Sequence, residues 1–210
     1  QSADEDAAGR QAFRAARRTA TFWAIWLTCL LSFTGQVGFL FHEISIFTPR
    51  MGLTLAGYAV SVTVIAAAVG RFVLGAAARR APLGLVAAGA YLIQACGLVL
   101  ANLGDGIALS FAAAGVVGLI VGALVMLPAM LVRAAFGAVG FGRTFGLASI
   151  GMFAGMTVGP GLAGFLADAV GYGAAIWTFA GCQVAAAVVI AVGFRPVARP
   201  VKLSPETLSA

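Results

Sequence analysis

Three ionisable side chains lie inside long apolar stretches of the sequence, where a charge is costly. His42 and Glu43 lie toward the end of one such stretch. Arg71 lies in the next one, about eight residues or ~12 Å along a helix before the basic pair Arg79 and Arg80. In a membrane, an arginine at this depth costs roughly 2.5–3.5 kcal/mol on insertion scales, so it should face protein, water or an anion. These residues are therefore the first candidates for chemistry.

Each of these candidates has two interpretations. Arg71 could bind the carboxylate of a small molecule, or it could satisfy backbone carbonyls where two helices cross. Glu43 could carry a proton, with His42 assisting it or contacting a ligand. Alternatively, both residues are interfacial and hydrogen-bonded to neighbouring helix ends. The sequence leaves these alternatives open.

Other polar residues in the apolar stretches indicate structure as readily as function. Asp168 lies near the end of a stretch, where we expect it to cap the next helix or to order the turn rather than to bind an ion. Five more could either line a cavity or bond between helices: Gln36, Ser61, Thr63, Tyr91 and Gln94.

Enzymatic motifs are missing from the sequence. Cys29, Cys96 and Cys182 lie in apolar stretches without metal-ligand spacing, so we expect these cysteines to pack as small buried hydrophobic residues. Residues 159–164 match the dinucleotide pattern Gly-x-Gly-x-x-Gly, but they lie in an apolar stretch with no preceding strand. We therefore expect no enzyme activity, no cofactor and no metal.

The apolar stretches themselves predict membrane-spanning helices. Of the residues, 61% are hydrophobic and 10% charged, against roughly 25% charged in soluble domains. The stretches are near twenty residues long, which is the length of helix that crosses a bilayer core of about 30 Å. We predict an all-α polytopic protein with six spans, at residues 22–46, 57–78, 83–101, 107–132, 144–168 and 174–194.

The basic residues predict how the spans are oriented. The net charge is +6, but the basic residues punctuate the spans instead of forming one soluble basic face, so nucleic acid is not an expected partner. Most of them lie at the termini and in every second connection between spans, which puts them on one side of the membrane. The positive-inside rule then makes that side, with both termini, cytoplasmic. The residues concerned are Arg10, Arg14, Arg17, Arg18, Arg79, Arg80, Arg133, Arg143, Arg195, Arg199 and Lys202.

Glycine spacing predicts where helices approach closely. Gly151, Gly155 and Gly159 recur every fourth residue, as do Gly118 and Gly122, so each set shares one helical face. Small residues on one face let membrane helices pack at short range. We expect packing seams at both faces.

Three parts of the chain resemble the major facilitator superfamily of transporters. Residues 69–75 (VGRFVLG), which lead to Arg79 and Arg80, resemble helix eight and its following loop in the monocarboxylate and oxalate/formate type. Residues 151–173 resemble helix eleven and the turn into helix twelve, through Gly159-Pro160-Gly161, Gly164, Asp168 and Gly171-Tyr172. Phe22-Trp23, Gly35, Gly38 and His42 resemble helix seven, so the similarity covers residues 17–195.

This resemblance implies the C-terminal six-helix half of such a transporter. Residues 1–20 would be a cytoplasmic linker with an interfacial amphipathic stretch, 21–195 the bundle, and 196–210 a cytoplasmic tail. The bundle would consist of two inverted three-helix repeats, and it would work with an N-terminal six-helix half. Because the chain begins with Gln1, it reads as a fragment or a split half. A bacterial inner membrane is the expected location.

The resemblance also implies roles for residues. An arginine at the place of Arg71 contacts the substrate carboxylate in that group, which implies transport of a small organic anion, and His42 would lie near the cavity. The loop after helix eight often has an aspartate four residues after its glycine, but Arg79 stands there after Gly75, so this loop lacks the gating carboxylate. The alternative functions are a stand-alone six-helix oligomeric channel, or a structural or sensor subunit without transport.

Overall fold

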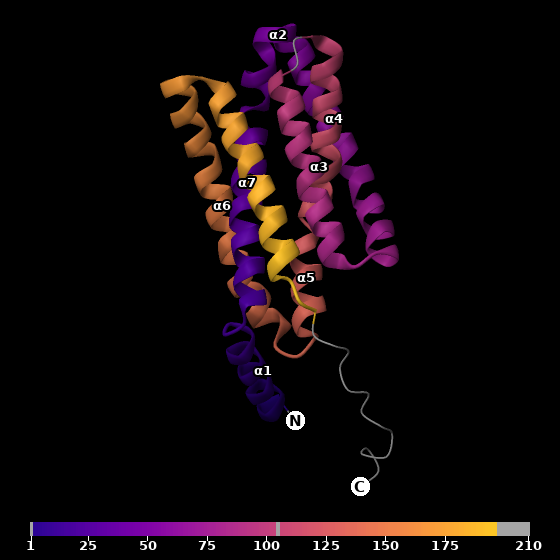
Figure 1. Ribbon diagram of the computed structural model, residues 1–210, viewed down its shortest axis with the longest axis vertical. Helices are drawn as coiled ribbons and strands as arrows, with labels where there is room; N and C mark the ends of the chain where they lie inside the picture. The colour runs from indigo at the N-terminus through magenta and orange to yellow at the C-terminus, as the bar shows by residue number, and fades with distance from the viewer. Residues whose placement is uncertain (1, 104–105, 197–210) are drawn as a thin grey trace.

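The chain is a bundle of long helices in a computed structural model that describes residues 2–103 and 106–196, and no strand occurs among these residues. The helices are α1 (Ser2–Ala16), α2 (Ala20–Arg80), α3 (Leu83–Leu103), α4 (Ile107–Leu124), α5 (Leu127–Phe136), α6 (Phe141–Val170) and α7 (Tyr172–Gly193). Figure 1 shows them packed lengthwise, with α1 at one end of the bundle. The predicted all-α class is confirmed.

Helix α2 is two antiparallel arms joined at one residue. Gly52 has non-helical dihedral angles, with φ 78° and ψ 162°, inside an otherwise continuous helical stretch. A positive φ of this kind favours glycine. In Figure 1 the helix turns back on itself at the end of the bundle away from α1. We call residues 20–51 arm A and residues 53–80 arm B; they contain the predicted spans 22–46 and 57–78.

The span predicted at residues 107–132 is not one continuous helix. Helix α4 ends at Leu124, and α5 begins at Leu127 with Pro128 in its first turn. Proline has no N–H to give to the carbonyl four residues earlier, and its ring clashes there, so the helix is interrupted. The spans predicted at 83–101 and 144–168 fall within α3 and α6, and the span predicted at 174–194 ends one residue beyond α7.

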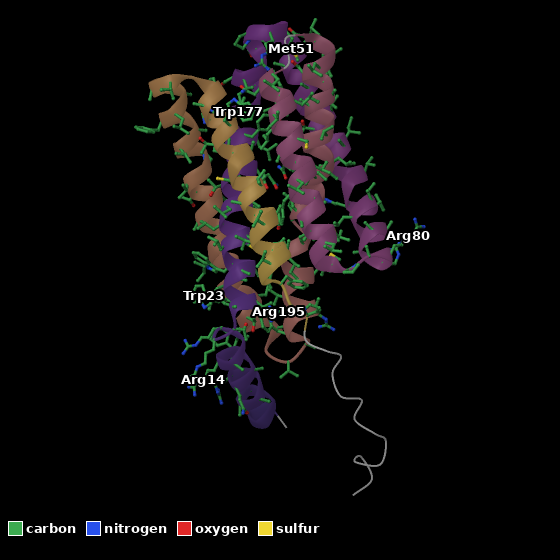
Figure 2. The ribbon with its side chains drawn as sticks, viewed as in Figure 1. Arg14, Trp23, Met51, Arg80, Trp177 and Arg195 are labelled. Atoms are coloured by element: carbon green, nitrogen blue, oxygen red, sulfur yellow. The ribbon has the colours of Figure 1, made fainter. Side chains whose placement is uncertain are left out.

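The surface of the bundle is that of an integral membrane protein. Five helical segments are long and apolar enough to cross a membrane, with α2 counted as one and α4 with α5 as another. Large apolar side chains are exposed along them, including Phe72 at 81% and Val192 at 75%. Such exposure suits contact with lipid rather than water. Arg14 and Arg195 lie toward the end of the molecule away from Met51, and Arg80 lies about midway along it (Figure 2).

Two glycine faces form close helix contacts, as the sequence predicted. Seam A joins α6 to arm A, and there a Cβ on Gly155 would lie 2.5 Å from the carbonyl oxygen of Leu30. Seam B joins α4 to arm B, and there a Cβ on Gly122 would overlap the carbonyl of Ala67. In both seams the absence of a side chain lets two backbones touch. Gly151 and Gly159 extend seam A, and Gly118 and Gly70 extend seam B.

Candidate functional site

Arg71 stands at a hollow between both arms of α2 and helix α4. The hollow has a volume of about 410 Å³. Arm B supplies most of its wall, arm A supplies Leu40, and α4 supplies Val121. Within the described part of the chain, no carboxylate forms a salt bridge with Arg71. The full lining is Leu40, Thr63, Val64, Ala67, Ala68, Arg71 and Val121.

The spacing of residues on arm B explains this hollow. Thr63, Ala67 and Arg71 recur every fourth residue and so lie along one side of the helix. Ala67 and Ala68 are small, so there is open space between the threonine and the arginine. Seam B fixes this side against α4, because the backbone at Thr63 and Ala67 contacts Gly118 and Gly122. The hollow is therefore held by backbone packing rather than by its own side chains.

Glu43 lies behind the hollow and reaches it through Thr63. The Glu43 side chain belongs to arm A and is 1% exposed. Its Oε1 atom is 2.5 Å from Oγ1 of Thr63, and the same Oγ1 is 3.2 Å from the carbonyl oxygen of Ala114 on α4. The three groups therefore link arm A, arm B and α4 at the inner wall of the hollow.

Counting protons in this link favours the protonated carboxyl group. A threonine hydroxyl has one proton, so it cannot donate both to an ionised Glu43 and to the Ala114 carbonyl. When Glu43 is protonated, its O–H donates to Thr63, and the Thr63 hydroxyl donates to the carbonyl, so each group is satisfied. A buried carboxylate without a cation would also be costly, and no salt bridge reaches Glu43 within the described residues.

His42 lies apart from this group, against helices α6 and α7. Its Nε2 atom is 3.2 Å from the carbonyl oxygen of Pro160, and its Nδ1 atom is 3.1 Å from the hydroxyl of Tyr172. Because a carbonyl only accepts, Nε2 donates to Pro160, and Nδ1 pairs with the Tyr172 hydroxyl. The structure thus ties His42 to two neighbouring helices and does not bring it to Arg71 or to the carboxyl group of Glu43.

The remaining predicted residues lie at helix ends and in the seams. Gly75 is half-buried, and Arg79 and Arg80 are exposed at the end of arm B. Gly155 and Gly159 are buried in seam A, with Pro160 partly buried beside them.

The helix cap expected of Asp168 as one of two roles is not made, and Cys96 is not buried as expected. No side chain caps α7 within the described residues: its N-cap is Gly171, and Asp168 lies exposed in the last turn of α6. A carboxylate there is still on the preceding helix, so the predicted cap is not made. Cys29 is buried as predicted, but Cys96 is exposed among apolar neighbours on the outer side of α3.

The roles of two residues, Thr63 and Arg50, were not assigned from the sequence. Thr63 was one of five polar residues that could line a cavity or bond between helices, and it does both. Of the other four, Ser61 is exposed, whereas Gln36, Tyr91 and Gln94 are buried between helices. The signal for Thr63 is its place eight residues, or two helical turns, before Arg71 on the same helix.

Arg50 has a structural role at the opposite end of the bundle. Its guanidinium donates to the carbonyl oxygens of Ala101 and Asn102, the latter at 3.1 Å. These are among the last carbonyls of α3, which lack helical partners, and a positive charge is favourable at that end of a helix. The contact holds the turn of α2 against α3.

Metal binding has no support in the described residues, where no three of His, Cys, Asp or Glu side chains gather as ligands. The arrangement instead offers an open guanidinium for an anion and a buried carboxyl group for a proton. No protein-family model matches the chain, and a search of curated proteins found no similar sequence.

Proposed function

We propose that this chain is half of a secondary transporter for a small organic anion, of the major facilitator type. The observation that carries the proposal is the open Arg71 guanidinium in a hollow of about 410 Å³, with no salt-bridge partner among the described residues. A planar guanidinium binds a carboxylate through two parallel hydrogen bonds. The volume lies within the range of small-molecule sites, roughly 300–1,000 Å³. A monocarboxylate is the substrate class that this chemistry fits.

The seams support the proposed repeat of three helices. In this proposal the two arms of α2 are separate spans, which gives six spans in two units. The first unit is arm A, arm B and α3. The second unit is α4 together with α5 as one span, followed by α6 and α7. Exchanging the two units maps arm A onto α4 and arm B onto α6. Seam A, between arm A and α6, is then mapped onto seam B, between α4 and arm B.

Transport itself requires a second six-helix bundle. Binding sites of such transporters lie between two halves near the middle of the membrane, and the Arg71 hollow is open on one side. Alternating access then exposes the Arg71-bound anion to each side in turn. The second bundle would be joined to this chain or supplied separately.

Glu43 is the proposed proton carrier. The buried carboxyl is connected to the substrate hollow by the Thr63 hydroxyl. Binding of an anion at Arg71 and protonation of Glu43 would occur in the same wall of the bundle, which couples the two events. Proton symport is the coupling mode that this arrangement favours.

Uptake of labelled lactate and oxalate into proteoliposomes that contain the complete transporter tests the proposal. Arg71→Gln is expected to abolish saturable uptake at matched insertion. Arg195→Gln removes the same charge from an exposed position outside the hollow and is expected to leave uptake unchanged. Equal uptake by the wild type and Arg71→Gln, or the absence of any carboxylate uptake, would overturn the anion assignment.

Two further measurements in the same experiment test the coupling ion and the need for a second bundle separately. Glu43→Gln is expected to remove the dependence of uptake on external pH, and an unchanged pH profile rejects the coupling role. The 210-residue chain alone is expected not to transport. Saturable uptake by it would favour the stand-alone oligomeric channel instead.

A further inference from the structure

Four arginines gather around a second hollow, at the end of the bundle where α1 meets α6. This hollow has a volume of about 400 Å³ and is far richer in polar surface than the one at Arg71. Arg10, Arg14 and Arg17 come from α1 and the residue after it, and Arg143 comes from the first turn of α6. Phe13 forms the apolar part of the lining.

The positions of the arginines follow from α1 and its attachment to the bundle. Arg10, Arg14 and Arg17 are spaced by four and three residues, so a helix presents them on one side. Arg143 is held near them because it donates to the Asp6 carboxylate and to the Asp6 carbonyl, both at 3.2 Å. Asp6 also lies 3.6 Å from Arg10. Among the described side chains, the Asp6 carboxylate therefore pairs with two of the four guanidinium groups, and a net positive charge remains.

Tryptophans place this hollow at the level of lipid headgroups. The indole N–H of Trp23 donates to the carbonyl oxygen of Arg17 at 3.0 Å, and the Trp26 ring lies 5.9 Å from the Trp23 ring. Trp23 is 53% exposed at the start of arm A, beside the arginines, whereas Trp177 lies toward the other end of the bundle (Figure 2). Exposed tryptophans mark the two membrane–water interfaces of a membrane protein.

We propose that the hollow between α1 and α6 binds the headgroup of an anionic phospholipid. The guanidinium groups of Arg14 and Arg17 donate to the phosphodiester oxygens, for which their planar geometry is suited. Arg10 and Arg143 add positive charge while they remain paired with Asp6. Phe13 contacts the glycerol backbone of the lipid. Because the exposed Trp23 bonds to the backbone of Arg17 and marks this end of the bundle as a membrane interface, a lipid fits the hollow better than a free phosphate ion.

The bound lipid would fix α1 against the bundle. In the described residues, Arg143 of α6 donates to the carboxylate and to the carbonyl oxygen of Asp6 on α1, and the backbone at Gly140 packs against Gly9. A phosphodiester that bridges arginines from both helices adds a further link at the membrane surface. This inference depends on the membrane location of the bundle and not on transport or on Arg71.

Binding of phosphatidylglycerol to the purified full chain tests the proposal. The chain is released from vesicles of phosphatidylcholine and phosphatidylglycerol into detergent, and retained lipid is measured by native mass spectrometry. We expect retained phosphatidylglycerol over phosphatidylcholine, and a loss of that preference of at least about tenfold in the double variant Arg14→Gln with Arg17→Gln. The matched control, Arg79→Gln with Arg80→Gln, removes the same charge elsewhere and is expected to keep the preference.

The other outcomes overturn the lipid site. Equal retention in both double variants, or an equal loss in both, would show that the hollow is not the site. Displacement of the lipid by inorganic phosphate at millimolar concentration would assign the hollow to a soluble anion. An unchanged melting temperature of each variant in phosphatidylcholine shows that the fold is intact, so loss of lipid cannot be attributed to unfolding.

Discussion

Seams A and B use the same glycine packing, but only seam B borders the hollow at Arg71. In seam A, Gly151 and Gly155 bring the backbone of α6 against arm A, and a Cβ at Gly151 would lie 2.7 Å from the Trp26 carbonyl oxygen. In seam B, Gly118 and Gly122 bring α4 against arm B at Thr63 and Ala67. Close packing by glycine is therefore not in itself a mark of function.

The difference lies in the side chains beside the contact. Thr63 is a residue of seam B, and its side chain joins Glu43 to the Ala114 carbonyl and lines the Arg71 hollow. The described hydroxyls of seam A make shorter-range bonds, such as that of Thr34 to the Leu30 carbonyl of its own helix. A tight backbone contact can thus support a polar site by holding a hydroxyl at a fixed place between two helices.

Gly122→Ala, in seam B, should cause the largest loss of stability. The new Cβ would overlap the Ala67 carbonyl, and backbone cannot move aside as a side chain can. We expect a loss of about 3 kcal/mol in unfolding free energy, measured by titration of the purified chain with SDS. Gly115→Ala on the same helix is the control, because its Cβ would come no closer than 3.9 Å to Val62. Equal stability of the two variants would contradict the seam.

Gly155→Ala should give a smaller loss, from seam A. Its Cβ would lie 2.5 Å from the Leu30 carbonyl oxygen and 2.9 Å from the amide nitrogen of Thr34. We expect about 2 kcal/mol by the same titration. Gly161→Ala, also on α6, has no neighbour within 4 Å and is expected to be neutral or stabilising, because alanine favours a helix. If Gly155→Ala matched that control, seam A would not depend on close approach.

Thr63→Val should cause the smallest loss of stability. It removes the hydroxyl group while it keeps the packing. Valine keeps the shape of threonine but leaves the buried Glu43 carboxyl without its described partner. We expect a loss of about 1 kcal/mol, with Thr63→Ser restoring most of it. Thr157→Val removes a hydroxyl that bonds within the exposed face of α6 and serves as the control. A neutral Thr63→Val would mean that the Glu43–Thr63 link contributes nothing to stability.

The sequence predicts the helices well because each depends on local composition and length. Apolar stretches near twenty residues long lie within α3, α6, α7 and the arms of α2. The break before Pro128 was missed because average hydropathy continues across it, although proline is itself a known helix breaker. The glycine seams were predictable because a four-residue spacing defines a helix face without any knowledge of the partner helix.

The site was predictable only in its charged members. Arg71 and Glu43 are identified by being ionisable in apolar surroundings. Their connection through Thr63 depends on how the arms of α2 pack, which spacing along one helix does not specify. His42 was expected near the cavity, but its partners Pro160 and Tyr172 are more than a hundred residues away along the chain. Contacts of that kind come from the tertiary fold.

The reversal at Gly52 has a consequence for the order in which the protein assembles. Glu43 and Thr63 are 20 residues apart, and Thr63 and Ala114 are 51 apart, whereas Leu30 and Gly155 of seam A are separated by more than a hundred. Small loops close at lower entropic cost, and a growing chain presents its N-terminal part first. We therefore expect the two arms of α2 to pair first, α4 to join them at seam B, and α6 and α7 to pack against arm A last. The polar wall beside Arg71 is in place before seam A exists.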